Sequence, residues 1–170
     1  MAEFTLTHAR VREALSYDDD TGLFRWRETR NNNARAGQLC GRRRNSDGYL
    51  SVCLDGIATP AHRLAWFWAH GEWPPEEVDH INGDRADNRI ANLRLATRVE
   101  NMRNKGLPKN NTSGAKGVTR HGDQWKAAAK VAGQYHYLGL FPSVEAAALR
   151  RREFVAAHFG QFVHEHERLA

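Results

Sequence analysis

Residues 78–105 constrain the fold of this chain more than any other stretch, because their pattern predicts a complete strand–loop–strand–helix unit. Residues 78–80 (Val-Asp-His) are typical of a short strand, and residues 82–84 (Asn-Gly-Asp) supply turn chemistry. Residues 93–96 alternate as a second strand does. Residues 97–100 (Thr-Arg-Val-Glu) form a capping box, which predicts that a helix begins there. The stretch therefore predicts a β-hairpin followed by a helix.

Three polar side chains of this unit are expected to meet. A helix packed across the hairpin would bring Asn101, in its first turn, towards Asp79 and His80. In isolation an aspartate here would be interpreted as a turn cap, the histidine as a core residue and the asparagine as a surface residue. Their joint spacing favours a catalytic cleft instead, because a mostly neutral imidazole can accept a proton from water. Carboxylate and amide oxygens are ligands that suit Mg²⁺ or Mn²⁺.

These residues resemble the HNH (ββα-metal) motif of phage and intron-encoded endonucleases. Its signature is Asp-His, an Asn twelve residues after the His, and an Asn nine residues further on; here these are Asp79-His80, Asn92 and Asn101. The resemblance implies that His80 and Asn92 occupy the catalytic positions and that Asp79 and Asn101 bind Mg²⁺ or Mn²⁺. We expect the amides of Asn92 and Asn88 to order the loop between the strands. No structural zinc is expected, because Cys40 and Cys53 form no C-x-x-C pair.

Upstream of the motif, residues 62–70 are apolar nearly all round and predict a buried helix that ends at Gly71. His62 has two interpretations, a hydrogen-bonded core histidine, which we favour, and a catalytic residue.

The segment 29–47 is rich in Asn, Arg and Gly and predicts a long exposed loop, in which Arg42–Arg44 could be a solvated face or contact phosphates. The other elements expected in this half are a helix over 5–15, a strand over 23–27, and a hairpin of strands 48–54 and 57–61 that turns at Asp55-Gly56.

Positive charge is concentrated at the C-terminal end. Residues 106–163 contain eight Lys/Arg against three acidic residues, a net charge of +5 that equals that of the whole chain. A basic segment of this kind permits a nucleic-acid partner without proving one. The chain has no apolar run near 18 residues and no signal peptide, so we expect a cytoplasmic protein with no membrane partner.

Residues 106–115 are rich in Gly, Pro, Asn and Ser and predict a basic linker. Beyond it, three strands over 116–119, 125–131 and 135–141 are expected, followed by a helix that Ser143 caps. That helix is Ala-rich on one side and is expected to present Arg150–Arg152 on another. The predicted unit is a three-stranded antiparallel sheet packed on one helix.

The pattern K-G-V, W-x-A-A, Y-L-G-x-F, S-x-E-A-A and F-G-x-F resembles the plant ethylene-response-factor (APETALA-type) DNA-binding domain. In that family the sheet lies in the major groove. The resemblance implies this DNA-facing set: Lys116, Thr119, Arg120, Lys126, Ala128, Lys130, Tyr135 and Tyr137. We also expect Lys109 of the linker to bind DNA. Thr119, Ala128 and Tyr137 depart from the plant pattern, so its base preference does not transfer. We interpret Trp125 as a core residue rather than a base reader.

The predicted fold class is α+β, with a small β-rich N-terminal scaffold and a ββα-metal motif. The predicted domains are an HNH nuclease domain over 1–105 with its ββα core at 78–105, the linker 106–115, and a DNA-binding domain over 116–163. The expected function is metal-dependent hydrolysis of double-stranded DNA, by a phage-encoded protein in a bacterial host. One motif supplies one active site, so we expect a nicking monomer; cleavage of both strands would need a dimer. The alternatives are a DNA-binding regulator with an inactive nuclease half, and an RNA-binding or RNA-cleaving protein.

Overall fold

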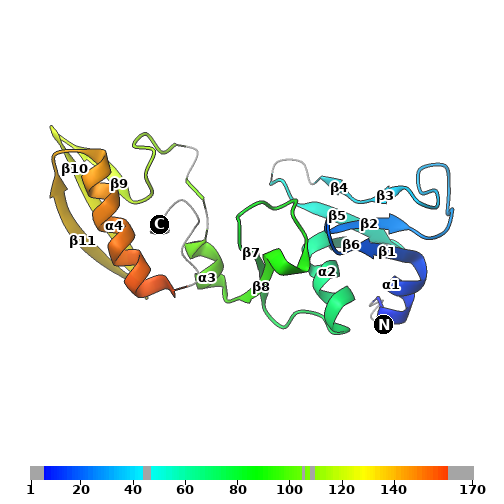
Figure 1. Ribbon diagram of the computed structural model, residues 1–170. Coiled ribbons are helices and arrows are strands. Elements are labelled where there is room, and N and C mark those ends of the chain that lie inside the picture. The colour runs from blue at the N-terminus through cyan, green and yellow to red at the C-terminus, as the bar shows by residue number, and fades with distance from the viewer. Residues whose placement is uncertain (1–5, 44–46, 105, 108–109, 161–170) are drawn as a thin grey trace. The chain divides into compact units, whose positions relative to one another are not determined.

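The computed structural model describes residues 6–43, 47–104, 106–107 and 110–160. These contain four α-helices and several small antiparallel sheets, which confirms the α+β class (Figure 1). The chain divides into two compact units, Met1–Arg98 and Val99–Ala170. The functional division at residues 105 and 116 stays a prediction. Within the described ranges no helix combines the length and apolar character needed to cross a membrane.

The first unit begins with a short helix and a sheet of order β1-β2-β3. Thr7 caps the helix, as its hydroxyl accepts a hydrogen bond from the Arg10 amide at 3.2 Å. The predicted strand over 23–27 is confirmed as β2. The elements are α1 (His8–Ala14), β1 (Leu15–Asp18), β2 (Leu23–Trp26) and β3 (Leu39–Cys40).

A second sheet and the central helix follow. β5 (Leu50–Leu54) and β6 (Ile57–Pro60) form the predicted hairpin, whose turn residues Asp55 and Gly56 have φ of 51° and 81°, as a type I′ turn requires. α2 (Ala61–His70) ends at Gly71 with φ of 78°, as predicted. Its Leu64 and Ala65 are fully buried, and the helix packs against α1, β5, β6 and β7. α2 is therefore the centre of the hydrophobic core of this unit.

The prediction of a long exposed loop over 29–47 was wrong at two short strands. β3 pairs with β2, and β4 (Arg42–Arg43) pairs with β5, so the segment contributes an edge strand to each sheet. These strands have two residues each and lie in a segment with little apolar content. Their pairing depends on the backbone of distant strands, which explains why the local composition does not predict them.

The hairpin predicted over residues 78–96 completes the unit. β7 (Glu77–His80) pairs with β8 (Leu93–Ala96), and the 3₁₀ turn η1 (Ile90–Asn92) leads into β8. Val78 and Leu93 join the hydrophobic core that surrounds α2. The helix predicted after Thr97 is α3 (Arg98–Arg103).

The second unit is a three-stranded antiparallel sheet of order β11-β10-β9, with a long helix across one face (Figure 1). Its elements are β9 (Val118–His121), β10 (Gln124–Val131), β11 (Gln134–Phe141) and α4 (Val144–Phe159). Ser143 caps α4 as predicted. Ala127 on the sheet and Ala147 on the helix are fully buried, and such small side chains allow helix and sheet to approach closely.

One residue of the arginine run on α4, Arg151, is buried against the sheet and does not face solvent. Arg151 is only 5% exposed, and its Nε donates to the carbonyl of Ala128 at 3.0 Å. Burial lowers the pKa of its guanidinium to about 10. Arg150 and Arg152 are exposed, as expected. Arg151 instead joins α4 to β10 beside Gly117, whose positive φ of 64° and lack of a side chain leave room for it.

Candidate active site

His80 stands at the end of β7, where its imidazole contacts the side chain of Asn88. Its Nε2 lies 3.1 Å from Asn88 Oδ1, while Asn88 Nδ2 donates to the carbonyl of Ala86 at 3.1 Å. The second bond orients the amide so that its oxygen faces the imidazole. Neutral His80 therefore has its proton on Nε2 and its lone pair on Nδ1. Because His80 is only 3% exposed, burial lowers the pKa of the imidazole below its ordinary value and favours the neutral form.

The backbone at Asn88 is fixed by the β1–β2 hairpin. The hydroxyl of Tyr17 donates to the carbonyl of Asn88 at 2.7 Å. Gly22, in the turn of that hairpin, packs so closely that an added Cβ would lie 2.4 Å from the Arg89 nitrogen and 2.5 Å from the Asn88 carbonyl carbon. Asn88 itself is fully buried. The N-terminal scaffold thus positions the partner of His80.

Gly22→Ala is expected to lower both stability and cleavage. At φ of 70° an alanine costs about 1–2 kcal/mol, and the clash with the Asn88–Arg89 backbone adds about 1–3 kcal/mol. The free energy of unfolding from urea titration measures the loss, and plasmid cleavage measures the effect on His80.

Gly37→Ala is the matched control, because Gly37 has φ of 79° and nothing within 4 Å of an added Cβ. It should show the conformational cost alone and leave cleavage unchanged. Equal losses of stability and of cleavage in the two variants would mean that the contact between Gly22 and the Asn88 backbone affects neither quantity.

Asp79 is a buried carboxylate in an ion pair across the hairpin. It lies opposite Arg94 in the β7–β8 register, and its Oδ2 accepts from Arg94 Nε at 2.9 Å and from an Arg94 terminal nitrogen at 2.7 Å. The side chains of Asp79 and Arg94 are 6% and 11% exposed. A divalent ion bound to Asp79 would therefore share this carboxylate with a guanidinium.

Asn92 orders the loop, as its sequence position suggested. Its Oδ1 accepts from the Asn82 amide at 3.0 Å, and its Nδ2 donates to Asn82 Oδ1 and to the carbonyl of Asp87 at 2.9 and 2.8 Å. Asn92 is 8% exposed. These bonds join the two ends of the loop between β7 and β8. A direct catalytic role for Asn92 stays a prediction.

Two rings from outside the hairpin lie beside His80. The ring centroid of His62, on α2, is 5.2 Å from that of His80, and the ring of Tyr49, just before β5, is 5.2 Å from His62 and 5.9 Å from His80. His62 is therefore part of the surroundings of His80, and the geometry is compatible with both of its interpretations.

The donor set around Asp79 suits a hard, water-rich cation. Across the described ranges, no three His, Cys, Asp or Glu side chains gather as a metal site. The Asp79 carboxylate is an oxygen ligand of the kind that hard divalent cations prefer. The second predicted ligand, Asn101, lies on α3 in the second unit, and its pairing with Asp79 stays a prediction.

Most of the predicted DNA-facing residues share the sheet face opposite α4. Cross-strand partners lie on one face, and the register pairs Lys126 with Thr119, Lys130 with Tyr135, and Ala128 with Tyr137. Tyr135 and Tyr137 are 63% and 57% exposed. Arg120 is an exception, since it pairs with Trp125 and its guanidinium lies 5.8 Å from that ring. Lys116 precedes β9 and is not on a strand. Lys109 and Arg44 lie outside the described residues.

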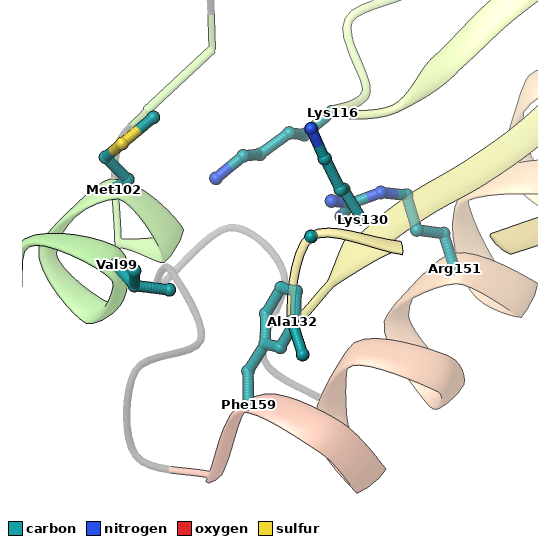
Figure 2. A pocket seen from close by; sticks show the side chains of 8 residues that line it. Val99, Met102, Lys116, Lys130, Ala132, Arg151 and Phe159 are labelled. Atoms are coloured by element: carbon teal, nitrogen blue, oxygen red, sulfur yellow. The ribbon is translucent and has the colours of Figure 1, made fainter. Parts of the chain in front are cut away.

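The second unit also has a hollow of about 380 Å³. Figure 2 shows Lys116, Lys130 and Arg151 on one side of it and Val99 and Met102 of α3 on the other, with Phe159 below. The lining is mainly apolar with a cationic side. Two of the predicted DNA-binding lysines therefore lie together although they are 14 positions apart in the chain.

Sequence reasoning missed Tyr17 and Gly22, which fix the backbone of Asn88, and Tyr49, whose ring lies beside His80. Their contacts link positions far apart in the chain, such as Tyr17 and Asn88, which are separated by 71 positions. No local pattern could indicate them. Asn88 was expected to order the loop, but its contact with His80 was not predicted.

Comparison with known proteins agrees with this geometry. Residues 59–103, from the end of β6 through α3, match the HNH endonuclease family. Protein 3.8 of Escherichia phage T7 is 32% identical to the chain over 106 residues, which cover 59% of this chain and 88% of that protein. No solved structure matches. The chain therefore belongs to the same family as Protein 3.8 of phage T7, and its residues 59–103 form a domain of the HNH endonuclease family.

Proposed function

We propose that the chain is an Mg²⁺-dependent endonuclease that nicks double-stranded DNA as a monomer in the cytoplasm of a phage-infected bacterium. An HNH domain implies DNA as the substrate and a divalent metal ion. The observation that supports the proposal best is the fixed orientation of the buried His80 imidazole, whose Nε2 lies 3.1 Å from Asn88 Oδ1. A buried histidine of this kind, next to a buried carboxylate, suits hydrolysis better than binding alone.

Each of these residues has a different proposed role in hydrolysis. His80 accepts the proton of the attacking water at Nδ1, and its lowered pKa keeps it competent as a base at neutral pH. Asn88 prevents rotation of the imidazole. Asn92 and the loop it joins keep the end of β7 in register with the start of β8.

Asp79 is the residue proposed to hold the metal, with Asn101 as its second protein ligand. When bound, Mg²⁺ supplies positive charge for the leaving 3′-oxygen and the phosphate oxygens. Arg94 keeps the Asp79 carboxylate in place by two hydrogen bonds.

The C-terminal unit is proposed to recognise DNA. Its sheet has one face covered by α4, and the other face presents Lys126, Lys130 and two exposed tyrosines. The resemblance to ethylene-response-factor domains supports major-groove binding by this face. Lys116 and Lys130 lie near enough to line one hollow, which favours contact with neighbouring phosphates.

Lys130→Ala is expected to weaken DNA binding and to flatten its salt dependence by roughly 0.9 in log–log slope, the effect of one lost phosphate contact. Arg150→Ala is the matched control, since it removes the same charge from the opposite side of the unit, where Arg150 pairs with Glu153 at 3.7 Å. Fluorescence anisotropy at several salt concentrations measures both. Equal slopes for Lys130→Ala and the wild type would exclude a phosphate contact by Lys130.

The proposed activity is tested with supercoiled plasmid in Mg²⁺ and in EDTA. Nicked circles that accumulate before linear DNA, only with metal, are the expected result. Linear product without a nicked intermediate would indicate that a dimer, and not a monomer, cuts the DNA. Binding without cleavage in any divalent metal would favour the alternative, a DNA-binding regulator with an inactive nuclease half.

A further inference from the structure

Two arginines of the loop between β7 and η1 are bound in different ways. Arg89 pairs with the Asp87 carboxylate at 2.6 and 2.7 Å, which neutralises its charge locally. Arg85 instead donates to the backbone carbonyl of Asp47 at 2.6 Å, and its guanidinium carbon lies 4.9 Å from the centroid of the Tyr49 ring. A carbonyl and an aromatic face hold a guanidinium in place without cancelling its charge.

The same tyrosine connects Arg85 to the site. The Tyr49 ring is 5.9 Å from the His80 ring and 5.2 Å from the His62 ring. Arg85 is half-buried, and the segment before β5 that contacts it comes from a different part of the chain. The Arg85 guanidinium is thus a cation held in place next to Tyr49, whose ring lies beside His80.

A guanidinium held in this way suits a phosphate oxygen. Its planar set of donors binds phosphate in one orientation, and one bond to a carbonyl leaves other N–H groups for a ligand. A phosphodiester brought to His80 has negative oxygens on more than one side. A metal held by Asp79 would supply positive charge to the phosphate, and Arg85 would supply a second cation.

We infer that Arg85 is a phosphate-binding residue of the cleavage site, oriented by Tyr49 and by the Asp47 carbonyl, and that it contacts the DNA strand that is cut. The inference rests on the proposed nuclease function. Arg85 binds the phosphate beside His80 and limits its movement while the water attacks.

The experiment compares Arg85→Ala with Arg89→Ala in the full-length chain. Both remove one positive charge from the same loop, so they change long-range attraction to DNA equally. Arg85→Ala is expected to slow single-turnover nicking by about 10- to 100-fold, the loss typical of one charge-assisted hydrogen bond, whereas Arg89→Ala should change the rate by less than about threefold. Millimolar guanidinium should restore part of the rate to Arg85→Ala only.

A binding measurement keeps the inference testable apart from the proposed function. In EDTA, Arg85→Ala should flatten the salt dependence of binding to a short duplex by roughly 0.9, Arg85→Lys should keep the wild-type slope, and Arg89→Ala should leave it unchanged. If the wild type failed to cut DNA but these slopes differed as described, the nuclease proposal would fail while the phosphate contact of Arg85 stood. Indistinguishable slopes for Arg85→Ala and Arg89→Ala, with thermal midpoints matching the wild type, would overturn the inference.

Discussion

His80→Ala is expected to slow plasmid nicking by about 10²- to 10⁴-fold, the usual contribution of a general base, while leaving DNA affinity nearly unchanged. The variant removes the proton acceptor and no phosphate contact. Single-turnover nicking gives the rate, and anisotropy with a labelled duplex gives the affinity. Wild-type turnover in His80→Ala would show that another group accepts the proton.

Two further variants separate chemistry from folding. His80→Gln keeps a polar side chain near Asn88 and should be equally inactive, with less change in the thermal midpoint than His80→Ala. His70→Ala removes an exposed histidine from the end of α2, where it stacks on Trp66, and should leave the rate unchanged. A parallel loss of rate and thermal midpoint across these variants would attribute the defect to folding.

Asp79→Ala is expected to abolish metal-dependent cleavage and to destabilise the first unit. The substitution removes the proposed metal ligand, and it also leaves the largely buried Arg94 guanidinium without its carboxylate, which costs about 3–5 kcal/mol. Asp79→Asn retains an oxygen that can accept from Arg94 and should recover part of the stability but little of the activity. Urea unfolding measures the first effect and an Mg²⁺ titration of nicking measures the second.

Asp84→Asn is the control for charge, since Asp84 is an exposed carboxylate of the loop after β7 whose side chain accepts from the Ala86 amide. It should change stability by less than about 0.5 kcal/mol and leave the Mg²⁺ titration unaltered. An Mg²⁺ titration of Asp79→Asn that matched the wild type would exclude Asp79 as the ligand.

The sequence by itself determined the elements whose signals are local. Alternation and turn chemistry predicted β7, β8 and the β5–β6 hairpin with its Asp55-Gly56 turn, and the apolar run ended by Gly71 predicted α2. The motif spacing identified the HNH domain because its residues lie within one short unit. The C-terminal sheet and helix were predicted for the same reason, as each strand there follows the previous one through a tight turn.

Only the tertiary structure decided which residues surround His80. Asn88 depends on Tyr17 and Gly22 for its position, and Arg85 depends on Tyr49, so each contact joins segments that no sequence period relates. The same holds for the two-residue strands β3 and β4, which pair with strands of other segments, and for Arg151, whose place under the sheet follows from its bond to Ala128. Local patterns predict backbone hydrogen bonds and apolar faces. Long-range packing selects the side chains that orient a catalytic group, since it brings distant backbone segments together.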